Sequence, residues 1–339
     1  MKKKILIVGA GGFIGGYIAR EALNRGYETW VGVRESTSRR YLTDERLHFL
    51  VLNYDSAEEM EAAIGESMPG GDRWDAVIYN LGATKAVNFM DFNRVNFTYL
   101  RTFVETLKKM GKVPERFLYM SSLSALGPYD EKNYTPIPSD ARPDPDTRYG
   151  LSKIKAESYL RDMSGVPYII FRPTGVYGPH EKDYLLMIEC IDKHWDFSVG
   201  LRKQLLTFIY VEDLVNAMFD ALQAGVVNKT YNIAEGRAYT QAEFRSIVAE
   251  ELGKKWVIPV KLPLWAVWTA SAVAEKMAAA KMQASTLNRD KYKIMRQRNW
   301  DCDISAAQKD FGFNPKFNLR DGLRETIKAY REMNREGGK

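Results

Sequence analysis

The chain has 339 residues, long enough for one large domain or two intertwined domains around a substantial core. Apolar residues make up 45% and charged residues 27% of it, a composition that excludes a disordered, collagen-like or coiled-coil protein. The net charge is +6, and the segment from Lys276 to Arg298, with seven basic residues and one acid, accounts for all of it. Because this excess is local, it indicates a contact surface and argues against a general affinity for nucleic acid.

The first half of the chain alternates short β-rich runs with helical stretches. A strand is expected over Ile5–Val8, a helix over Tyr17–Asn24 and a second strand over Thr29–Val33. Further strands are expected at Leu47–Leu52, Ala76–Tyr79, Phe117–Met120 and Tyr168–Phe171, with helices over Glu58–Ile64 and Phe97–Met110. Strands separated by helices predict βαβ units and a parallel sheet. After about residue 174 the pattern loosens, which predicts a smaller second lobe.

A glycine-rich turn, Gly9-Ala-Gly-Gly-Phe-Ile-Gly15, follows the first strand and opens the first helix. Glycine permits a tight turn and lets a pyrophosphate approach the backbone N–H groups at the positive end of a helix. Gly9, Gly12 and Gly15 fit the spacing G-x-x-G-x-x-G, whereas Ile14 occupies the last position of G-x-G-x-x-G. Between a strand and a helix, this motif predicts a dinucleotide-binding site.

The end of the second strand bears on which dinucleotide binds. An NAD-binding fold usually places an acid there for the ribose 2′-hydroxyl, but this strand runs into Arg34, with Glu35 next and Arg39 shortly after. An arginine at this point suits a 2′-phosphate through a charge-assisted contact. The sequence therefore favours NADP, while NAD stays open because Glu35 could turn toward the ribose.

Tyr149 and Lys153 form a Y-x-x-x-K pair at the start of a predicted helix, where they project from one face about one turn apart. Free tyrosine titrates near ~10, so a nearby cation that lowers its pKa makes it a better acid–base group. Ser121 and Ser122 follow the strand Phe117–Met120, whose carboxyl end lies over the crevice where ligands of such sheets bind.

In this order and spacing, the motifs resemble the extended short-chain dehydrogenase/reductase superfamily, in its epimerase/dehydratase-like branch. The resemblance covers essentially the whole chain. Besides the glycine turn, it rests on segments that are similar to the family's later signatures: Asn80-Leu-Gly-Ala83, Arg172-Pro-Thr-Gly-Val-Tyr-Gly-Pro179, Val211-Glu-Asp213 and Phe311-Gly-Phe-Asn-Pro315. Asn96 also stands where the family often keeps an asparagine.

This resemblance implies the fold and the division of the chain. We expect a Rossmann-type, doubly wound parallel sheet over residues 1–174 and about 208–234. A smaller, mostly helical substrate lobe is expected over about 175–207 and 235–320, followed by a C-terminal helix over 321–339.

The resemblance also implies the residues of the site. It gives Ser122, Tyr149 and Lys153 as the catalytic set; Ser122 is preferred to Ser121 because it lies five residues before Gly127. The cofactor would contact residues of every motif: Gly9, Gly12, Phe13, Ile14, Gly15, Arg34, Arg39, Asn53, Leu81, Gly82, Ala83, Tyr149, Lys153, Pro173 and Val176. Asn53 stands where an aspartate commonly contacts adenine, so either Asn53 or Asp55 takes that role. The three histidines lack metal-ligand spacing, so no metal site is expected.

Three functions fit these motifs: an NADP-dependent ketone reductase or secondary-alcohol dehydrogenase, a nucleotide-sugar epimerase or dehydratase, and a non-catalytic dinucleotide sensor. Sensors commonly lose the Tyr/Lys pair, which is intact here. Nucleotide-sugar members usually carry a diphosphate-binding arginine where this chain has Leu206. The stretches from Leu287 to Tyr292 and from Trp300 to Ala306 resemble the branch with 3β-hydroxysteroid dehydrogenases and lipid-ketone reductases. We therefore favour a lipophilic substrate, such as a keto-steroid or keto-sphingolipid.

The segment 262–298 permits two interpretations. Leu264, Trp265, Trp268 and Ala272 recur at helical spacing, and Met277 and Met282 follow beside the basic cluster. Such a surface suits peripheral contact with an anionic membrane, but the same pattern describes a lobe helix buried on one face. The longest uncharged apolar run, Leu262–Ala274, is too short to span a bilayer. With no disulfide framework among the two cysteines, we expect a cytoplasmic protein, and a homodimer is a further expectation.

Overall fold

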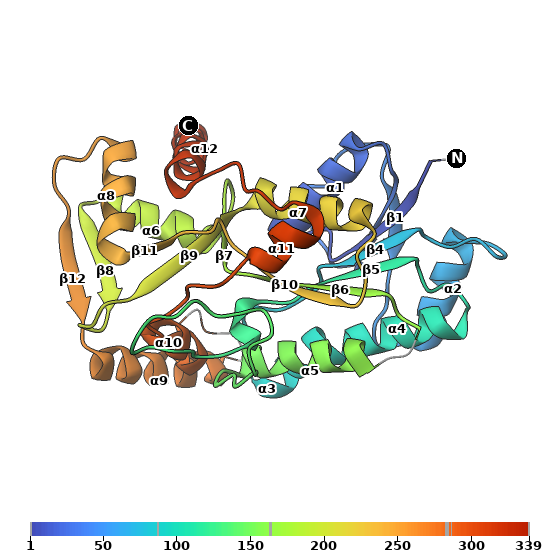
Figure 1. The fold of residues 1–339 in the computed structure, drawn as a ribbon, viewed down its shortest axis with the longest axis horizontal. Coiled ribbons are helices and arrows are strands. Elements are labelled where there is room, and N and C mark those ends of the chain that lie inside the picture. The colour runs from blue at the N-terminus through green and yellow to red at the C-terminus, as the bar shows by residue number, and fades with distance from the viewer. Residues whose placement is uncertain (1, 87, 163–164, 282–284, 286, 338–339) are drawn as a thin grey trace.

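A parallel sheet of seven strands forms the centre of the computed structural model, which describes residues 2–86, 88–162, 165–281, 285 and 287–337 (Figure 1). Its order is β10-β6-β5-β4-β1-β2-β3, and every neighbouring pair runs parallel. The strands are β1 (Lys4–Val8), β2 (Glu28–Val33), β3 (His48–Val51), β4 (Ala76–Tyr79), β5 (Arg116–Met120), β6 (Tyr168–Pro173) and β10 (Lys229–Ile233). The predicted strands all appear, and the Rossmann-type α/β fold is confirmed.

Helices cover both faces of this sheet because its buried strands alternate apolar side chains between them. On one face, Ile5 and Ile7 pack with α1 (Phe13–Asn24), α7 (Val211–Ala224) and α11 (Ser305–Phe311). On the other, Leu6 and Val8 pack with α2 (Ala57–Ser67), α4 (Tyr99–Lys109) and α5 (Arg148–Asp162). Figure 1 shows these two helical layers above and below the strands.

The helix predicted over Phe97–Met110 differs in its first turns. The structure has a short helix α3 (Phe89–Asn93), then a π-helical turn η1 (Arg94–Thr98), and only then α4. The π-helical turn contains Asn96, which is fully buried and bonded to the loop after β4. A π turn inserts a residue into a helix and thereby re-aims its side chains, which apolar spacing in the sequence does not reveal.

The second lobe combines helices with two small sheets. One sheet has the order β11-β9-β7 and the other pairs β12 with β8. Its strands are β7 (Gly175–Tyr177), β8 (Trp195–Val199), β9 (Leu205–Tyr210), β11 (Ala238–Thr240) and β12 (Ile258–Leu262). Its helices are α6 (Lys182–Asp192), α8 (Gln241–Leu252), α9 (Leu264–Ala280), α10 (Arg289–Arg296) and α12 (Leu319–Gly337). The segment 208–234 leaves this lobe through β9 and returns to the large sheet as α7 and β10.

The helix α9 is not buried among lobe side chains. Val267 and Ser271 face inward, but Trp265 and Trp268 lie in solvent. The interpretation of α9 as a core helix predicted that both tryptophans are buried, and this is wrong. Met282, which sequence analysis placed in the same cluster, lies outside the described residues. In the described part of the chain, no helix combines the length and apolar character needed to cross a membrane.

Gly15 is the position in the glycine turn where a side chain fits least well. An added Cβ would lie 2.5 Å from the carbonyl oxygen of Gly9 and 2.6 Å from that of Ala10. Gly15→Ala should therefore push α1 away from β1 and destabilise the fold by about 1–3 kcal/mol in urea unfolding. Gly65→Ala in α2 is the control, since its Cβ would meet only Met110 at 3.7 Å and should stabilise by up to about 1 kcal/mol. Equal changes in the free energy of unfolding for the two variants would contradict this packing argument.

Candidate active site

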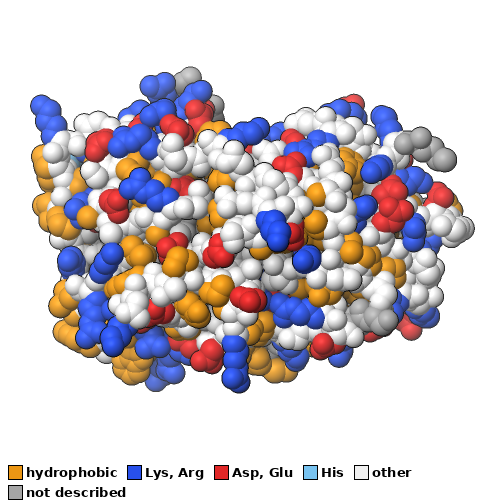
Figure 2. All heavy atoms as spheres, in the orientation of Figure 1, with side chains coloured by type: hydrophobic (Ala, Val, Ile, Leu, Met, Phe, Trp, Pro, Cys, Tyr) orange, Lys and Arg blue, Asp and Glu red, His pale blue; other side chains and the backbone are white. Residues whose placement is uncertain are grey.

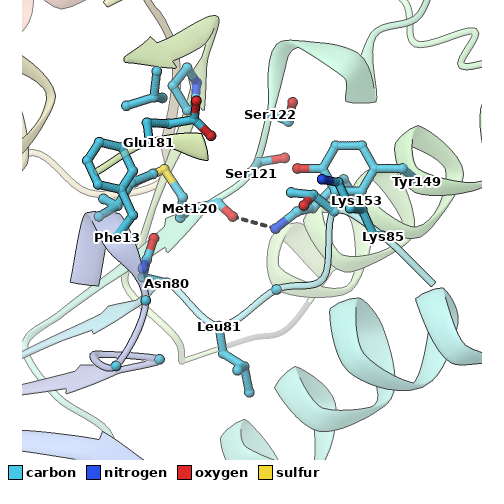
Figure 3. A pocket seen from close by; sticks show the side chains of 18 of the residues that line it. Phe13, Asn80, Leu81, Lys85, Met120, Ser121, Ser122, Tyr149, Lys153 and Glu181 are labelled. Carbon is cyan, nitrogen blue, oxygen red and sulfur yellow. Dashed lines mark hydrogen bonds between the residues drawn. The ribbon is translucent and has the colours of Figure 1, made fainter. Parts of the chain in front are cut away.

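A cavity of about 770 Å³ opens at the carboxyl edge of the large sheet. The strand order reverses there, between β1 and β4, which is where open α/β sheets bind their ligands. The predicted residues that line it are Gly9, Gly12, Phe13, Ile14, Arg34, Leu81, Gly82, Ser122, Tyr149, Lys153, Pro173 and Val176. The fold thus brings most of the predicted site, drawn from segments far apart in the sequence, into one cavity (Figure 3).

The glycine turn forms the floor of this cavity. Gly9 adopts a φ of +79°, and a Cβ there would lie 2.6 Å from the backbone nitrogen of Leu81. Gly12 caps α1 without any side-chain hydrogen bond to the first turn, and an added Cβ would meet only one atom, at 3.9 Å. The N-terminal N–H groups of α1 therefore face a space that no side chain fills, as the pyrophosphate of a dinucleotide requires.

Arg34 lies directly after β2 and lines the cavity together with Ser36, Thr37 and Ser38. Its backbone N–H donates to the Thr37 hydroxyl at 3.0 Å, which holds the turn closed. Glu35 is exposed and is not part of the cavity wall. The strand end therefore offers a guanidinium and hydroxyl groups to a ligand, and no carboxylate from Glu35.

Tyr149 and Lys153 lie one turn apart on α5 and face the end of β5, where Ser121 and Ser122 follow (Figure 3). The Lys153 ammonium donates to the carbonyl oxygen of Met120 at 2.7 Å. Gly82 permits this approach, because a Cβ there would lie 3.1 Å from the Lys153 nitrogen. Ser121 and Ser122 have different partners: Ser121 donates to Glu157 at 2.5 Å, while Ser122 accepts from the Ser124 backbone at 3.2 Å. This leaves Ser122 as the hydroxyl beside Tyr149.

Burial controls the ionisation of this pair. It raises the pKa of Tyr149 to about 12, although the Ser122 hydroxyl acts in the opposite direction. Burial also lowers the pKa of Lys153 to about 7, against the attraction of Glu157. The expectation that Lys153 lowers the pKa of Tyr149 is not met, because its ammonium lies 6.0 Å from the Tyr149 ring centroid and is directed at Met120. Tyr149 is therefore protonated at neutral pH.

A buried carboxylate that sequence analysis missed holds these residues in place. Glu157, two turns after Tyr149 on α5, is fully buried and binds Arg172 of β6 through contacts of 2.6 and 2.9 Å. It also accepts from Ser121 and, at 2.6 Å, from Arg161. In the sequence, only its position four residues after Lys153, on the same face of the helix, could have indicated that Glu157 supports the site. The contact with Arg172 joins segments that no motif connects.

Four predicted cofactor residues do not line the cavity. Gly15 packs behind the glycine turn, and Ala83 is bonded through its backbone to Asn96 at 2.7 Å. The Arg39 guanidinium lies 4.4 Å from the centroid of the Phe49 ring, and the Asn53 amide donates to Glu59 at 2.9 Å. Tyr54 lines the wall beside Asn53, and Asp55 pairs with Arg94 at 2.7 Å. Contacts of these residues with a cofactor remain predictions.

The lobe side of the cavity is acidic, which no motif indicated. Glu181, Asp183 and Asp290 line it beside Lys85 and Lys291. Asp183 binds both lysines, Lys85 at 3.1 Å and Lys291 at 2.9 Å. Asp290 accepts the backbone N–H of Tyr149 at 3.2 Å, so it caps the catalytic helix and faces the cavity at the same time.

Lys153→Met tests the burial of this ammonium. A lysine whose pKa falls from 10.5 to about 7 on folding binds more protons when the chain is unfolded, so its contribution to stability increases as pH rises through that window. The free energy of unfolding of wild type minus that of the variant should therefore increase from pH 7 to pH 10, as measured by urea denaturation. Lys155→Met, which removes an exposed lysine of the same helix, is the control. A difference for Lys153→Met that stays flat with pH would contradict the burial argument.

Comparisons with known proteins place the chain in a family. The NAD dependent epimerase/dehydratase family matches residues 5–234. The chain is 23% identical to UDP-glucose 4-epimerase of Vibrio cholerae (98% of this chain, 97% of the relative) and 23% identical to a ceramide reductase of Caulobacter vibrioides (96% and 94%). Its fold is similar to that of Thermotoga maritima UDP-glucose 4-epimerase with UDP-glucose (TM-score 0.77, 21% identity, 98% and 99% covered). It is also similar to that of Bacillus anthracis dTDP-glucose 4,6-dehydratase with NAD (TM-score 0.76, 18% identity, 98% of each chain).

The match over most of the chain, together with the cavity at the switch point of the sheet, agrees with the resemblance found in the motifs. The chain belongs to the NAD-dependent epimerase/dehydratase family and is an NAD(P)-dependent, oxidoreductase-type enzyme of the extended short-chain dehydrogenase/reductase superfamily.

Proposed function

We propose that the enzyme is an NADP-dependent ketone reductase, or secondary-alcohol dehydrogenase in the reverse direction, whose substrate is lipophilic, such as a keto-steroid or keto-sphingolipid. The observation that carries this proposal is the absence of cationic groups free to bind a diphosphate on the described part of the lobe side of the cavity. The lysines there, Lys85 and Lys291, are both bound to Asp183, and Glu181 and Asp290 add two further carboxyl groups. A substrate diphosphate would meet more carboxyl groups than ammonium groups.

The position of the family's diphosphate-binding arginine supports the same conclusion. Leu206 occupies it, and its side chain packs against the apolar cluster of the lobe that includes Phe208 and Tyr239. Arg202 and Lys203 are exposed and do not line the cavity. The name of the Caulobacter vibrioides relative, ceramide reductase, also agrees with a lipid ketone as substrate.

Arg34 supports NADP as the cofactor. It takes its place in the cavity wall where NAD enzymes of this fold usually have an acid, while Glu35 points elsewhere. A guanidinium with the Thr37 and Ser38 segment beside it suits the additional phosphate of NADP.

The chemistry follows from the positions of three side chains. When bound, NADPH would supply the hydride that reduces the carbonyl carbon of the substrate. Tyr149 donates its proton to the carbonyl oxygen, which completes the secondary alcohol; burial keeps this phenol protonated at neutral pH. Ser122 would hydrogen-bond the same oxygen and orient it. Lys153, whose ammonium donates to the carbonyl oxygen of Met120 at the end of β5, would hold the nicotinamide ribose.

A nucleotide-sugar epimerase or dehydratase is the second candidate, favoured by the names of many relatives and solved structures of similar fold. In those reactions the nicotinamide is recycled within each turnover, so no net NADPH is consumed. Net consumption of the cofactor therefore separates the two functions.

Arg34→Ala should weaken NADPH binding by on the order of tenfold to a hundredfold, because it removes a charge-assisted phosphate contact. NADH binding should change far less, which titration of both cofactors by fluorescence or calorimetry would show. Glu35→Ala is the matched control and should leave the preference unchanged. If Arg34→Ala weakened the binding of NADPH and NADH equally, the Arg34 guanidinium would not contact the 2′-phosphate. NAD would then again be a candidate cofactor.

The proposed function is tested by NADPH oxidation with keto-steroids, keto-sphingoid and keto-ceramide lipids, and UDP- and dTDP-sugars. We expect net oxidation with a lipid ketone and none with the sugars. Tyr149→Phe should lower kcat by ~10²–10⁴-fold, since it removes the transferable proton. Tyr159→Phe is the control, because this tyrosine of the same helix α5 donates to Glu105 at 2.8 Å and does not line the cavity. Conversion of a nucleotide sugar without consumption of NADPH would overturn the proposal.

A further inference from the structure

The outer face of α9 carries a mainly apolar stripe. Side chains at successive helical spacings project from it: Trp265, Trp268, Thr269, Ala272, Val273, Lys276 and Met277. Trp265 is 73% exposed, Trp268 49%, Val273 58% and Met277 61%. Large apolar side chains that lie together in solvent mark an interaction site on most soluble proteins. We refer to this set of residues as the α9 stripe.

Positive charge lies within and beside the α9 stripe. From residue 261 to 281 the chain has three lysines, Lys261, Lys276 and Lys281, against one acid, Glu275. All three lysines are exposed, and none of them belongs to a salt bridge among the described residues. The acid Glu275 is already paired, with Arg148 at 3.1 Å and Arg289 at 3.6 Å. Figure 2 shows orange and blue side chains side by side at the lower left, where α9 lies in Figure 1.

The helix that carries the α9 stripe is also in contact with elements of the catalytic cavity. The helix α10 packs against α9 and supplies Asp290, Lys291 and Ile294 to the cavity wall. The contact between Glu275 and Arg148 joins α9 directly to the residue before Tyr149. Whatever binds the stripe therefore contacts a helix that packs directly against the wall of the site.

We propose that the α9 stripe docks on an anionic phospholipid bilayer, with α9 lying in the plane of the interface. Tryptophan is suited to the headgroup boundary, and lysines beside an apolar helix face attract anionic lipid. A second copy of the chain is a poorer occupant, because a two-fold axis through the stripe would bring the lysines of both copies together. Docking depends only on this surface; its use to take up a membrane-dissolved ketone rests on the proposed function.

Vesicle sedimentation tests this proposal without cofactor or substrate. At low salt the wild type should sediment with phosphatidylcholine vesicles that contain anionic phosphatidylglycerol, and this binding should weaken as salt increases. The double substitution Trp265→Ser/Trp268→Ser should lower the partition coefficient at least on the order of tenfold. Lys261→Gln/Lys276→Gln should lower it by about fivefold per lysine. Reduction of a water-soluble ketone should be unchanged in all variants, so loss of docking is distinguishable from loss of activity.

Trp256→Ser is the matched control, because Trp256 is 58% exposed but precedes β12, at the opposite end of that strand from α9 (Figure 1). It should bind vesicles like the wild type. Circular dichroism and thermal unfolding should show that Trp265→Ser/Trp268→Ser keeps its fold, since Trp265 is mostly exposed and Trp268 about half exposed. The proposal is overturned if the wild type does not bind anionic vesicles, or binds neutral ones equally well. It is also overturned if the double variant binds normally, or changes from a dimer to a monomer in light scattering.

Discussion

The buried ion pair between Glu157 and Arg172 is the contact on which the geometry of the active site depends. Both side chains are almost completely removed from solvent, so their charges are tolerable only because each meets a partner. Glu157 receives hydrogen bonds from Arg172, Arg161 and Ser121, and Arg172 also donates to the carbonyl oxygen of Ser139 at 2.9 Å. One carboxylate thereby joins α5, β6 and the end of β5.

Because of the spacing of residues along α5, this ion pair also positions the catalytic side chains. Tyr149, Lys153 and Glu157 are four residues apart, so they lie on one face of the helix. When Glu157 fixes that face to Ser121, it also sets Tyr149 opposite the next residue, Ser122. Lys153 is held between them in a dry environment, which explains why its pKa falls to about 7 while that of Tyr149 rises to about 12.

Much of the fold could be predicted because its signals are local. Short β-rich runs predicted the strands of the large sheet up to Tyr168–Phe171. The glycine turn between a strand and a helix predicted where the cavity lies. The acidic lobe side could not be predicted, because Asp183 and Asp290 come from helices far apart in the sequence and belong to no motif. The apolar spacing of α9 is the same whether its tryptophans face a core or solvent, and only the packing of Val267 and Ser271 decides which. The contribution of Glu157 likewise depends on a partner in another element.

The fate of the hydride tests the proposed chemistry most directly. NADPH deuterated at both C4 positions is incubated with the enzyme and, in separate reactions, a lipid ketone or a UDP- or dTDP-sugar, and the products are analysed by mass spectrometry. A net reductase should place one deuterium on the carbinol carbon of the lipid alcohol and form one NADP⁺ for each alcohol. A lipid without deuterium, with NADPH unchanged while a nucleotide sugar is epimerised or dehydrated, would contradict the assignment of Ser122, Tyr149 and Lys153 to ketone reduction.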